Sequence, residues 1–232
     1  QVFKKVGMEP TGDPFNSLMK LENTDSSPYN PMINAGAIVV ASCLASEISF
    51  DTMLDTIRAL CMDPDINLDK KVYHSEMSHI SRNRAIAYLL ESKGYIEKNK
   101  DVENSLHFYV KMCSLSVTAE SLAGLGLILA NDGIHPDTGK RLLSSQAVKI
   151  VKTLMFTCGM YDGSGEFAVR VGIPSKSGVG GGILSVVDGE MGIGIFGPAL
   201  DKKGNSVAGE CVLEYMSHEL HLHMFDPQRH TL

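Results

Sequence analysis

The sequence predicts an α+β fold, in which a mainly helical part precedes a small antiparallel sheet and a C-terminal helix. Apolar residues recur at helical spacing up to about residue 158, and short alternating segments separated by glycines follow Gly159. Asp188-Gly189 lies between two apolar runs, as in a hairpin turn. We therefore expect one domain over residues 1–232, with the helical part at 1–158 and the strands and last helix at 159–232.

The helical part begins after a turn-rich segment. Residues 7–32 are rich in Gly, Pro, Asn, Asp and Ser, which predicts irregular structure. Helix starts are indicated by Ser81, by Thr118 with Ser121, and by Ser144 or Ser145, because short polar side chains cap helices. The spacing predicts helices over residues 33–46, 51–61, 81–94, 101–112, 119–130 and 147–156.

Three strands and a final helix are predicted after Gly159. The strands are expected at residues 167–171, 176–187 and 191–196, and the helix at 205–221. Three strands are few for a sheet that packs under helices, so we expect partner strands from elsewhere.

Composition excludes several classes of function. The chain has a net charge of −6, no basic run and no Trp, which argues against nucleic acid and against an anionic membrane surface as partners. The five cysteines are scattered and form no Cys-x-x-Cys, as in a reducing compartment. The apolar runs are too short to cross a bilayer and the first residues do not resemble a signal peptide, so we expect a cytoplasmic protein.

Lys176-Ser177-Gly178 is the most informative motif. It precedes Val179 and three glycines. A Lys-Ser/Thr-Gly triplet on a strand forms one part of the active site of serine acyl-transfer enzymes of the penicillin-binding type. The Val179 backbone N–H is then placed to stabilise an oxyanion. Two simpler interpretations remain open: a glycine-rich bulge, and Lys176 as an ordinary edge-strand lysine.

Four polar residues of the helical part stand out, and two of them, Glu76 and Asn83, suit an amino-acid ligand. Asn34 either caps its helix or presents an amide to a cleft. Glu76 and Asn83 share a face if one helix covers both, but Glu76 precedes the helix if Ser81 starts it. A carboxylate and an amide match an α-ammonium and an α-carboxylate. Tyr109 is expected to be a half-buried aromatic.

Tyr161 lies in a glycine-rich loop before the strands. A tyrosine there is either a loop aromatic or a proton shuttle. Ser17-Leu18-Met19-Lys20 is a Ser-x-x-Lys sequence in the turn-rich segment, where the helix that this chemistry requires is not expected. The histidines at 218, 221 and 223 do not form a zinc motif, because Leu222 stands where His-Glu-x-x-His requires histidine. No metal site is therefore predicted.

Taken together, these segments resemble the serine-dependent glutaminases, a β-lactamase-related family that includes bacterial and mitochondrial glutaminase. The matching stretches occur in family order and span nearly the whole chain. They are residues 9–12, 30–38, 75–76, 82–88, 108–109, 158–162 and 176–183.

The resemblance implies a β-lactamase/penicillin-binding-protein-like fold and hydrolysis of L-glutamine to L-glutamate and ammonia through a seryl acyl-enzyme. It also implies a homodimer or homotetramer without a cofactor. It assigns glutamine contacts to Asn34, Glu76, Asn83, Tyr109, Tyr161 and the Val179 backbone. Tyr161 and the Val179 N–H become catalytic groups, with Lys176 secondary.

One departure from the family is decisive for activity. The family's Ser-x-x-Lys helix and first strands lie N-terminal to the residue that matches Gln1. We therefore expect an N-terminally incomplete catalytic domain, inactive as this segment alone. Two alternatives remain: a penicillin-binding or β-lactamase-like acyl hydrolase, which gives no reason for Glu76, and a non-catalytic fragment that binds glutamine or glutamate.

Overall fold

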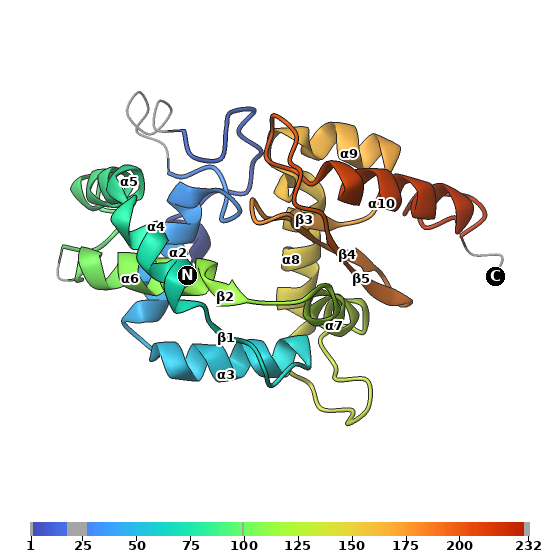
Figure 1. The fold of residues 1–232 in the computed structure, drawn as a ribbon, viewed down its shortest axis with the longest axis horizontal. Helices are drawn as coiled ribbons and strands as arrows, with labels where there is room; N and C mark the ends of the chain where they lie inside the picture. Colours follow the sequence, from blue (N-terminus) through green and yellow to red (C-terminus); the bar gives the residue numbers. More distant parts are fainter. Residues whose placement is uncertain (1, 18–26, 99, 230–232) are drawn as a thin grey trace. The chain divides into compact units, whose positions relative to one another are not determined.

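The computed structural model describes residues 2–17, 27–98 and 100–229 (Figure 1). It confirms the α+β class, because a series of helices precedes a three-stranded antiparallel sheet and a last helix. The chain divides into two compact units. The first comprises Gln1–Ile57 and Pro64–Ser116, and the second comprises Arg58–Asp63 and Val117–Leu232. Whether the chain is one functional domain stays a prediction.

The first unit is a helical assembly around one apolar core. Ile38 of α2, Ile86 of α5 and Leu106 of α6 are fully buried in this core. The Asp69 and Asp101 side chains cap α4 and α6. The unit contains η1 (Val2–Lys4), α2 (Asn34–Ala45), most of α3 (Phe50–Cys61), β1 (Asn67–Leu68), α4 (Lys70–Ser78), α5 (Ser81–Ser92), α6 (Val102–Cys113) and β2 (Leu115–Ser116).

The start of α2 is fixed by a close backbone approach. A Cβ at Gly36 would lie 2.0 Å from the Asn30 carbonyl oxygen, so only glycine fits there. The buried Asn30 side chain donates to the Glu9 carbonyl at 2.8 Å and accepts from the Met32 N–H at 2.9 Å. These contacts fix the loop that leads to Asn34.

The second unit is built on the sheet, whose strand order is β3-β4-β5. In this register Lys176 lies opposite Leu184, and Leu184 lies opposite Gly194. Glycines bring α7 directly onto β5: a Cβ at Gly192 would lie 2.2 Å from the Ala123 carbonyl oxygen, and a Cβ at Gly194 would lie 1.8 Å from that of Ala119. The unit contains α7 (Ala119–Ala130), α8 (Ser145–Cys158), η2 (Tyr161–Gly163), α9 (Ser164–Arg170), β3 (Ser175–Ser177), β4 (Gly182–Val187), β5 (Met191–Phe196) and α10 (Val207–Glu219).

The opposite face of the sheet carries the apolar core of this unit. Ile183 and Ile193 point away from α7 and pack with Leu213 of α10 and Phe167 of α9. A Cβ at Gly209 would lie 2.8 Å from the Ile183 Cδ1, so α10 also lies close to the sheet. The sheet therefore lies between α7 on one face and α10 on the other (Figure 1).

One predicted strand is wrong and another is interrupted. Residues 167–170 belong to a helix, α9, and Val171 is its C-cap residue: Phe167 and Val171 are buried while Val169 is 80% exposed, which is helical rather than alternating burial. The predicted strand at 176–187 is two strands, β3 and β4, separated by a turn in which Gly181 has φ +94°. The strand at 191–196 is confirmed as β5.

The predicted caps had mixed outcomes. Thr118 and Ser121 form the predicted capping box of α7, and Ser144 caps α8. Ser81 is not a cap, because Ile80 occupies that position and no side chain caps the helix. Over the described ranges no single helix is long and apolar enough to span a membrane; α2 and α3 meet the criterion only as a pair bent by 114°.

Candidate functional site

Asn34 and Asn83 lie together in the first unit. Asn34 is the first residue of α2, and its Nδ2 donates to the Asn83 Oδ1 of α5 at 2.9 Å. Capping by Asn34, one of the two interpretations left open, is wrong because Ile33 is the N-cap residue. The bond orients both amides, so the Asn83 Nδ2 can still donate to an anionic group.

Glu76 and Asn83 lie on different helices. Glu76 is exposed near the end of α4, and Asn83 lies in the first turn of α5. In the part of the chain that the structure describes, no hydrogen bond or ion pair engages the Glu76 carboxylate. Such a carboxylate retains its full capacity to accept hydrogen bonds from an ammonium group. Helix α4 was not predicted, since its apolar residues are few.

Tyr109 projects from α6 and is half-buried, as predicted. Its ring packs against the apolar core of the first unit, which is shared by α2, α5 and α6. The packing restricts the ring, and an aromatic side chain held in this way presents its hydroxyl in a defined direction.

Two polar contacts, absent from the sequence prediction, join helix α6 to α4 and to α5. The Tyr73 hydroxyl of α4 lies 2.6 Å from the Nδ1 of His107 on α6. One turn earlier on α6, Glu103 accepts two hydrogen bonds from Arg84 of α5, at 2.9 and 3.0 Å. The hydrogen bond from Arg84 holds the pKa of Glu103 below its usual value. Glu103 and His107 are four residues apart, a spacing that the sequence displays but does not connect to Tyr73.

In the second unit the structure brings together Tyr161 and Lys176. The Lys176 Nζ lies 4.5 Å from the centroid of the Tyr161 ring, a cation–π contact. Tyr161 has φ +54°, a left-handed conformation that is strained for a non-glycine residue. Strained residues of this kind concentrate at functional sites, because the surrounding structure must enforce them.

The segment before Tyr161 is bonded to strand β3. The Ser177 N–H donates to the Gly159 carbonyl at 3.0 Å, and a Cβ at Gly159 would lie 1.8 Å from the Ser175 carbonyl oxygen. Lys176 Nζ also donates to the Ser177 carbonyl. The Ser177 Oγ is buried and has no hydrogen-bond partner among the described residues. Lys176 and Tyr161 are therefore held by one short stretch of sheet edge.

Val179 lies in the turn between β3 and β4, not on a strand as predicted. The Gly181 N–H donates to the Gly178 carbonyl at 2.9 Å, so Val179 is the first inner residue of a β-turn. Its side chain is 52% exposed. Among the described residues, no backbone carbonyl accepts the Val179 N–H. The donor is thus available, although the backbone that presents it is a turn.

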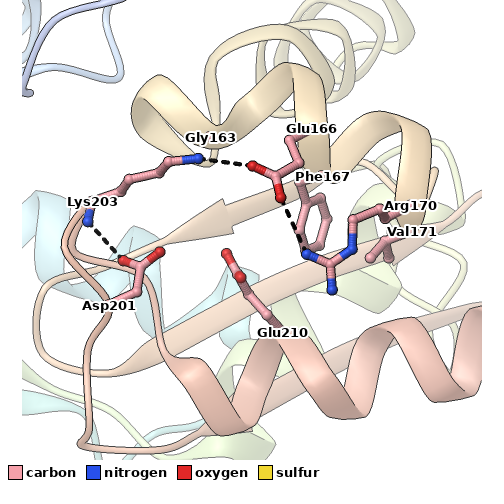
Figure 2. Close-up of a pocket in the computed structure, with 8 residues that line it drawn as sticks. All are labelled: Gly163, Glu166, Phe167, Arg170, Val171, Asp201, Lys203 and Glu210. Atoms are coloured by element: carbon pink, nitrogen blue, oxygen red, sulfur yellow. Dashed lines mark hydrogen bonds and ion pairs between the residues drawn. The ribbon is translucent and has the colours of Figure 1, made fainter.

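A separate cavity of about 210 Å³ lies between α9, α10 and the loop around Asp201 (Figure 2). Its wall includes Gly163, two residues after Tyr161, but none of the predicted site residues. Three carboxylates face two cations there: the Glu166 carboxylate accepts from Lys203 at 3.0 Å and from Arg170 at 3.4 Å. The other two carboxylates belong to Asp201 and Glu210.

Glu210 is the residue of this cavity whose carboxyl pKa is raised. Burial, and secondly the charge of Asp201, raise the pKa of its carboxyl above the usual value. Hydrogen bonding to Lys203 has the opposite effect on Glu166, whose pKa is lowered. The cavity therefore contains one carboxyl that resists ionisation beside one that is stabilised as an anion.

Two other motifs of the sequence acquire no site. Ser17 lies outside any helix, with its N–H donating to the Pro14 carbonyl at 2.9 Å, and Lys20 lies outside the described residues. Helix α10 ends at Glu219, and His221 follows with φ +52°. Within the described ranges no group of three or more His, Cys, Asp or Glu side chains is arranged to hold a metal ion.

Comparison with known proteins gives one consistent result. The family model described as Glutaminase matches residues 1–225. A glutaminase of Fusobacterium nucleatum is 54% identical over 228 residues, which are 97% of this chain and 74% of that protein. A glutaminase of Clostridioides difficile is also 54% identical, over 97% of this chain and 73% of its own length.

Solved structures agree with the sequence comparison. A Bacillus glutaminase crystallised in 4.3 M NaCl matches with a TM-score of 0.91 and 41% identity, over 97% of this chain and 77% of that one. The covalent complex of a Bacillus subtilis glutaminase with 5-oxo-L-norleucine matches with a TM-score of 0.84 and 38% identity, over 97% and 74%. The fold of this chain is thus the β-lactamase-like fold of these bacterial enzymes.

Proposed function

The chain belongs to the glutaminase family, and we propose that the full-length gene product hydrolyses L-glutamine to L-glutamate and ammonia. The family match over residues 1–225 is the observation that carries this proposal. It includes the segments that hold Asn34, Glu76, Asn83, Tyr109, Tyr161, Lys176 and Val179.

Glu76, Asn83 and Tyr109 are proposed to bind the amino-acid end of glutamine. The exposed Glu76 carboxylate accepts hydrogen bonds from the α-ammonium group. Asn83, oriented by its bond to Asn34, donates its Nδ2 to the α-carboxylate. The Tyr109 hydroxyl supplies a further contact, held in place by the packing of its ring. This chemistry selects a free amino acid over an acylated one, because acylation removes the cation that Glu76 recognises.

Tyr161 and the Val179 N–H are proposed to act at the carboxamide. The serine of the family's Ser-x-x-Lys motif attacks the side-chain carbonyl carbon through its hydroxyl oxygen, and its proton passes to Tyr161. The C–N bond breaks, and Tyr161 delivers that proton to the departing nitrogen, which leaves as ammonia. Water then attacks the glutamyl ester, returns a proton to the serine oxygen and releases glutamate. The Val179 N–H donates to the oxyanion in both steps. The Lys176 ammonium group, 4.5 Å from the centroid of the Tyr161 ring, is proposed to hold that ring in position for proton transfer.

The covalent complex reported for a Bacillus subtilis glutaminase supports a covalent intermediate, since it formed by reaction with 6-diazo-5-oxo-L-norleucine. The test is ammonia release from glutamine by the full-length gene product, with mass spectrometry after exposure to that reagent. Release with a covalent adduct is expected. Labelling by a fluorescent penicillin without glutamine turnover would instead favour an acyl hydrolase of the penicillin-binding type. Calorimetric binding of glutamine without ammonia release would favour a non-catalytic binding protein.

We further propose a cytoplasmic homodimer or homotetramer that needs no cofactor for catalysis. The five scattered cysteines support the location, and the net charge of −6 argues against nucleic acid as a partner. Light scattering coupled to size-exclusion chromatography tests the assembly, and a monomer at assay concentration refutes it.

A further inference from the structure

Helix α4, which carries Glu76, is held to its unit by few contacts. It has nine residues and none of them is buried. Only Tyr73 and Met77 pack partly against the apolar core. A short helix with so little buried surface has low local stability, so single side-chain contacts matter for its position.

The bond between Tyr73 and His107 is one of these contacts. The phenol oxygen lies 2.6 Å from the imidazole Nδ1, and the two rings pack with centroids 6.2 Å apart. Over the described residues, it is the one side-chain hydrogen bond that joins α4 to another element. Both side chains are half-buried, where a hydrogen bond is less weakened by water than at an exposed position.

The bond lies at the right place to set the position of Glu76. Tyr73 and Glu76 are three residues apart on α4, so their side chains are neighbours on the helix surface. On α6, His107 is two residues before Tyr109 and one turn after Glu103. The Glu103–Arg84 ion pair joins α6 to α5, next to Asn83. Glu76, Asn83 and Tyr109 therefore lie on three helices that these two side-chain contacts join.

We propose that Tyr73 and His107 form a positioning pair that holds α4 where Glu76 can recognise the α-ammonium group of glutamine. The inference rests on the role proposed above for Glu76. Neither member of the pair touches the reacting carboxamide. Loss of the bond therefore weakens recognition of the ammonium group without changing the chemical step.

The test is Tyr73→Phe in the full-length gene product, which removes only the hydroxyl. Kinetics are measured with glutamine and with glutaramate, which has the carboxamide but no α-ammonium group. We expect KM for glutamine to rise about three- to tenfold, the effect of one hydrogen bond, with kcat nearly unchanged. We expect kcat/KM for glutaramate to stay constant. Tyr215→Phe, at a tyrosine of α10 that is 68% exposed, is the matched control and should change kcat and KM for neither substrate.

Variants at the partner residue keep the inference falsifiable if Tyr73→Phe folds poorly. His107→Gln keeps an acceptor for the Tyr73 hydroxyl and should keep KM for glutamine close to that of the wild type. His107→Leu removes the acceptor and should raise KM as Tyr73→Phe does. An equal loss for glutamine and glutaramate in Tyr73→Phe, or equal effects of the two His107 variants, would refute the positioning pair.

Glu76→Gln separates the two levels of the proposal. If Glu76→Gln abolishes the preference for glutamine over glutaramate and Tyr73→Phe leaves it intact, the positioning pair is refuted and the role of Glu76 stands. If Glu76→Gln leaves the preference intact, the role of Glu76 fails and the pair fails with it.

Discussion

Replacing Val179 by proline tests the oxyanion donor with little effect on the fold. Val179 is the first inner residue of the β-turn at 178–181, a position that proline favours because its fixed φ suits the turn. Among the described residues no backbone carbonyl accepts the Val179 N–H, so its removal costs the folded state no backbone hydrogen bond. The side chain is 52% exposed, and little apolar contact is lost. The substitution therefore deletes the donor and leaves the turn in place.

The expected loss of activity is large. Removing one oxyanion donor costs about 3–4 kcal/mol of transition-state stabilisation, which corresponds to a decrease in kcat of about 10²–10³. The assay is steady-state ammonia release by the full-length gene product, with the Tm measured in parallel. Val179→Ala, which keeps the N–H, is the control and should stay within about threefold of wild type because the lost side-chain contact is small. A Val179→Pro protein that folds normally and retains wild-type kcat would show that this N–H does not stabilise the oxyanion.

Three further outcomes are expected. Lys176→Met removes the cation over the Tyr161 ring and should lower kcat about two- to thirtyfold while leaving KM nearly unchanged; a change in KM alone would contradict this role. Gly194→Ala should lower Tm by about 3–10 °C, because its Cβ would lie 1.8 Å from the Ala119 carbonyl oxygen, whereas Gly165→Ala, with open space around it, should not lower Tm. The raised pKa of Glu210 means that the folded chain holds this proton more tightly than the unfolded chain, so stability falls as pH rises through that pKa. Glu210→Gln should therefore raise Tm at about pH 8 and change it little at about pH 4. Thermal melts in which the substitution raises Tm more at pH 4 than at pH 8 would contradict a raised pKa of Glu210.

The sequence correctly predicted helices α7 and α8, whose first turn is capped by a side chain close in the sequence. The Thr118–Ser121 box and the Ser144 cap act within one helical turn, so the sequence alone locates α7 and α8. The strand prediction at 167–171 was wrong because the apolar residues of this segment fit both the two-residue period of a strand and the 3.6-residue period of a helix. Burial of Phe167 and Val171 with exposure of Val169 is decided by packing under the sheet, not by local preference.

The geometry around the predicted site residues could not be predicted from the sequence. The bond between Asn34 and Asn83 joins residues 49 positions apart and has no local signature. Likewise, the glycine run predicted close backbone approach after Val179, yet a turn rather than a strand presents the N–H. Helix α4 was not predicted because it buries no residue and has few apolar residues, so its sequence shows no clear helical periodicity.

The contrast between the two units leads to different kinetic expectations. Lys176 and the segment before Tyr161 are joined by the backbone bond from Ser177 of β3 to Gly159 at the end of α8, and a backbone bond does not depend on side-chain identity. Glu76 instead lies on a helix without buried residues, whose position depends on side-chain contacts. Substitutions that loosen the first unit should therefore raise KM through the amino-acid end of the substrate. Those that disturb the strand edge of the second unit should lower kcat, because they alter groups proposed to act in the transition state.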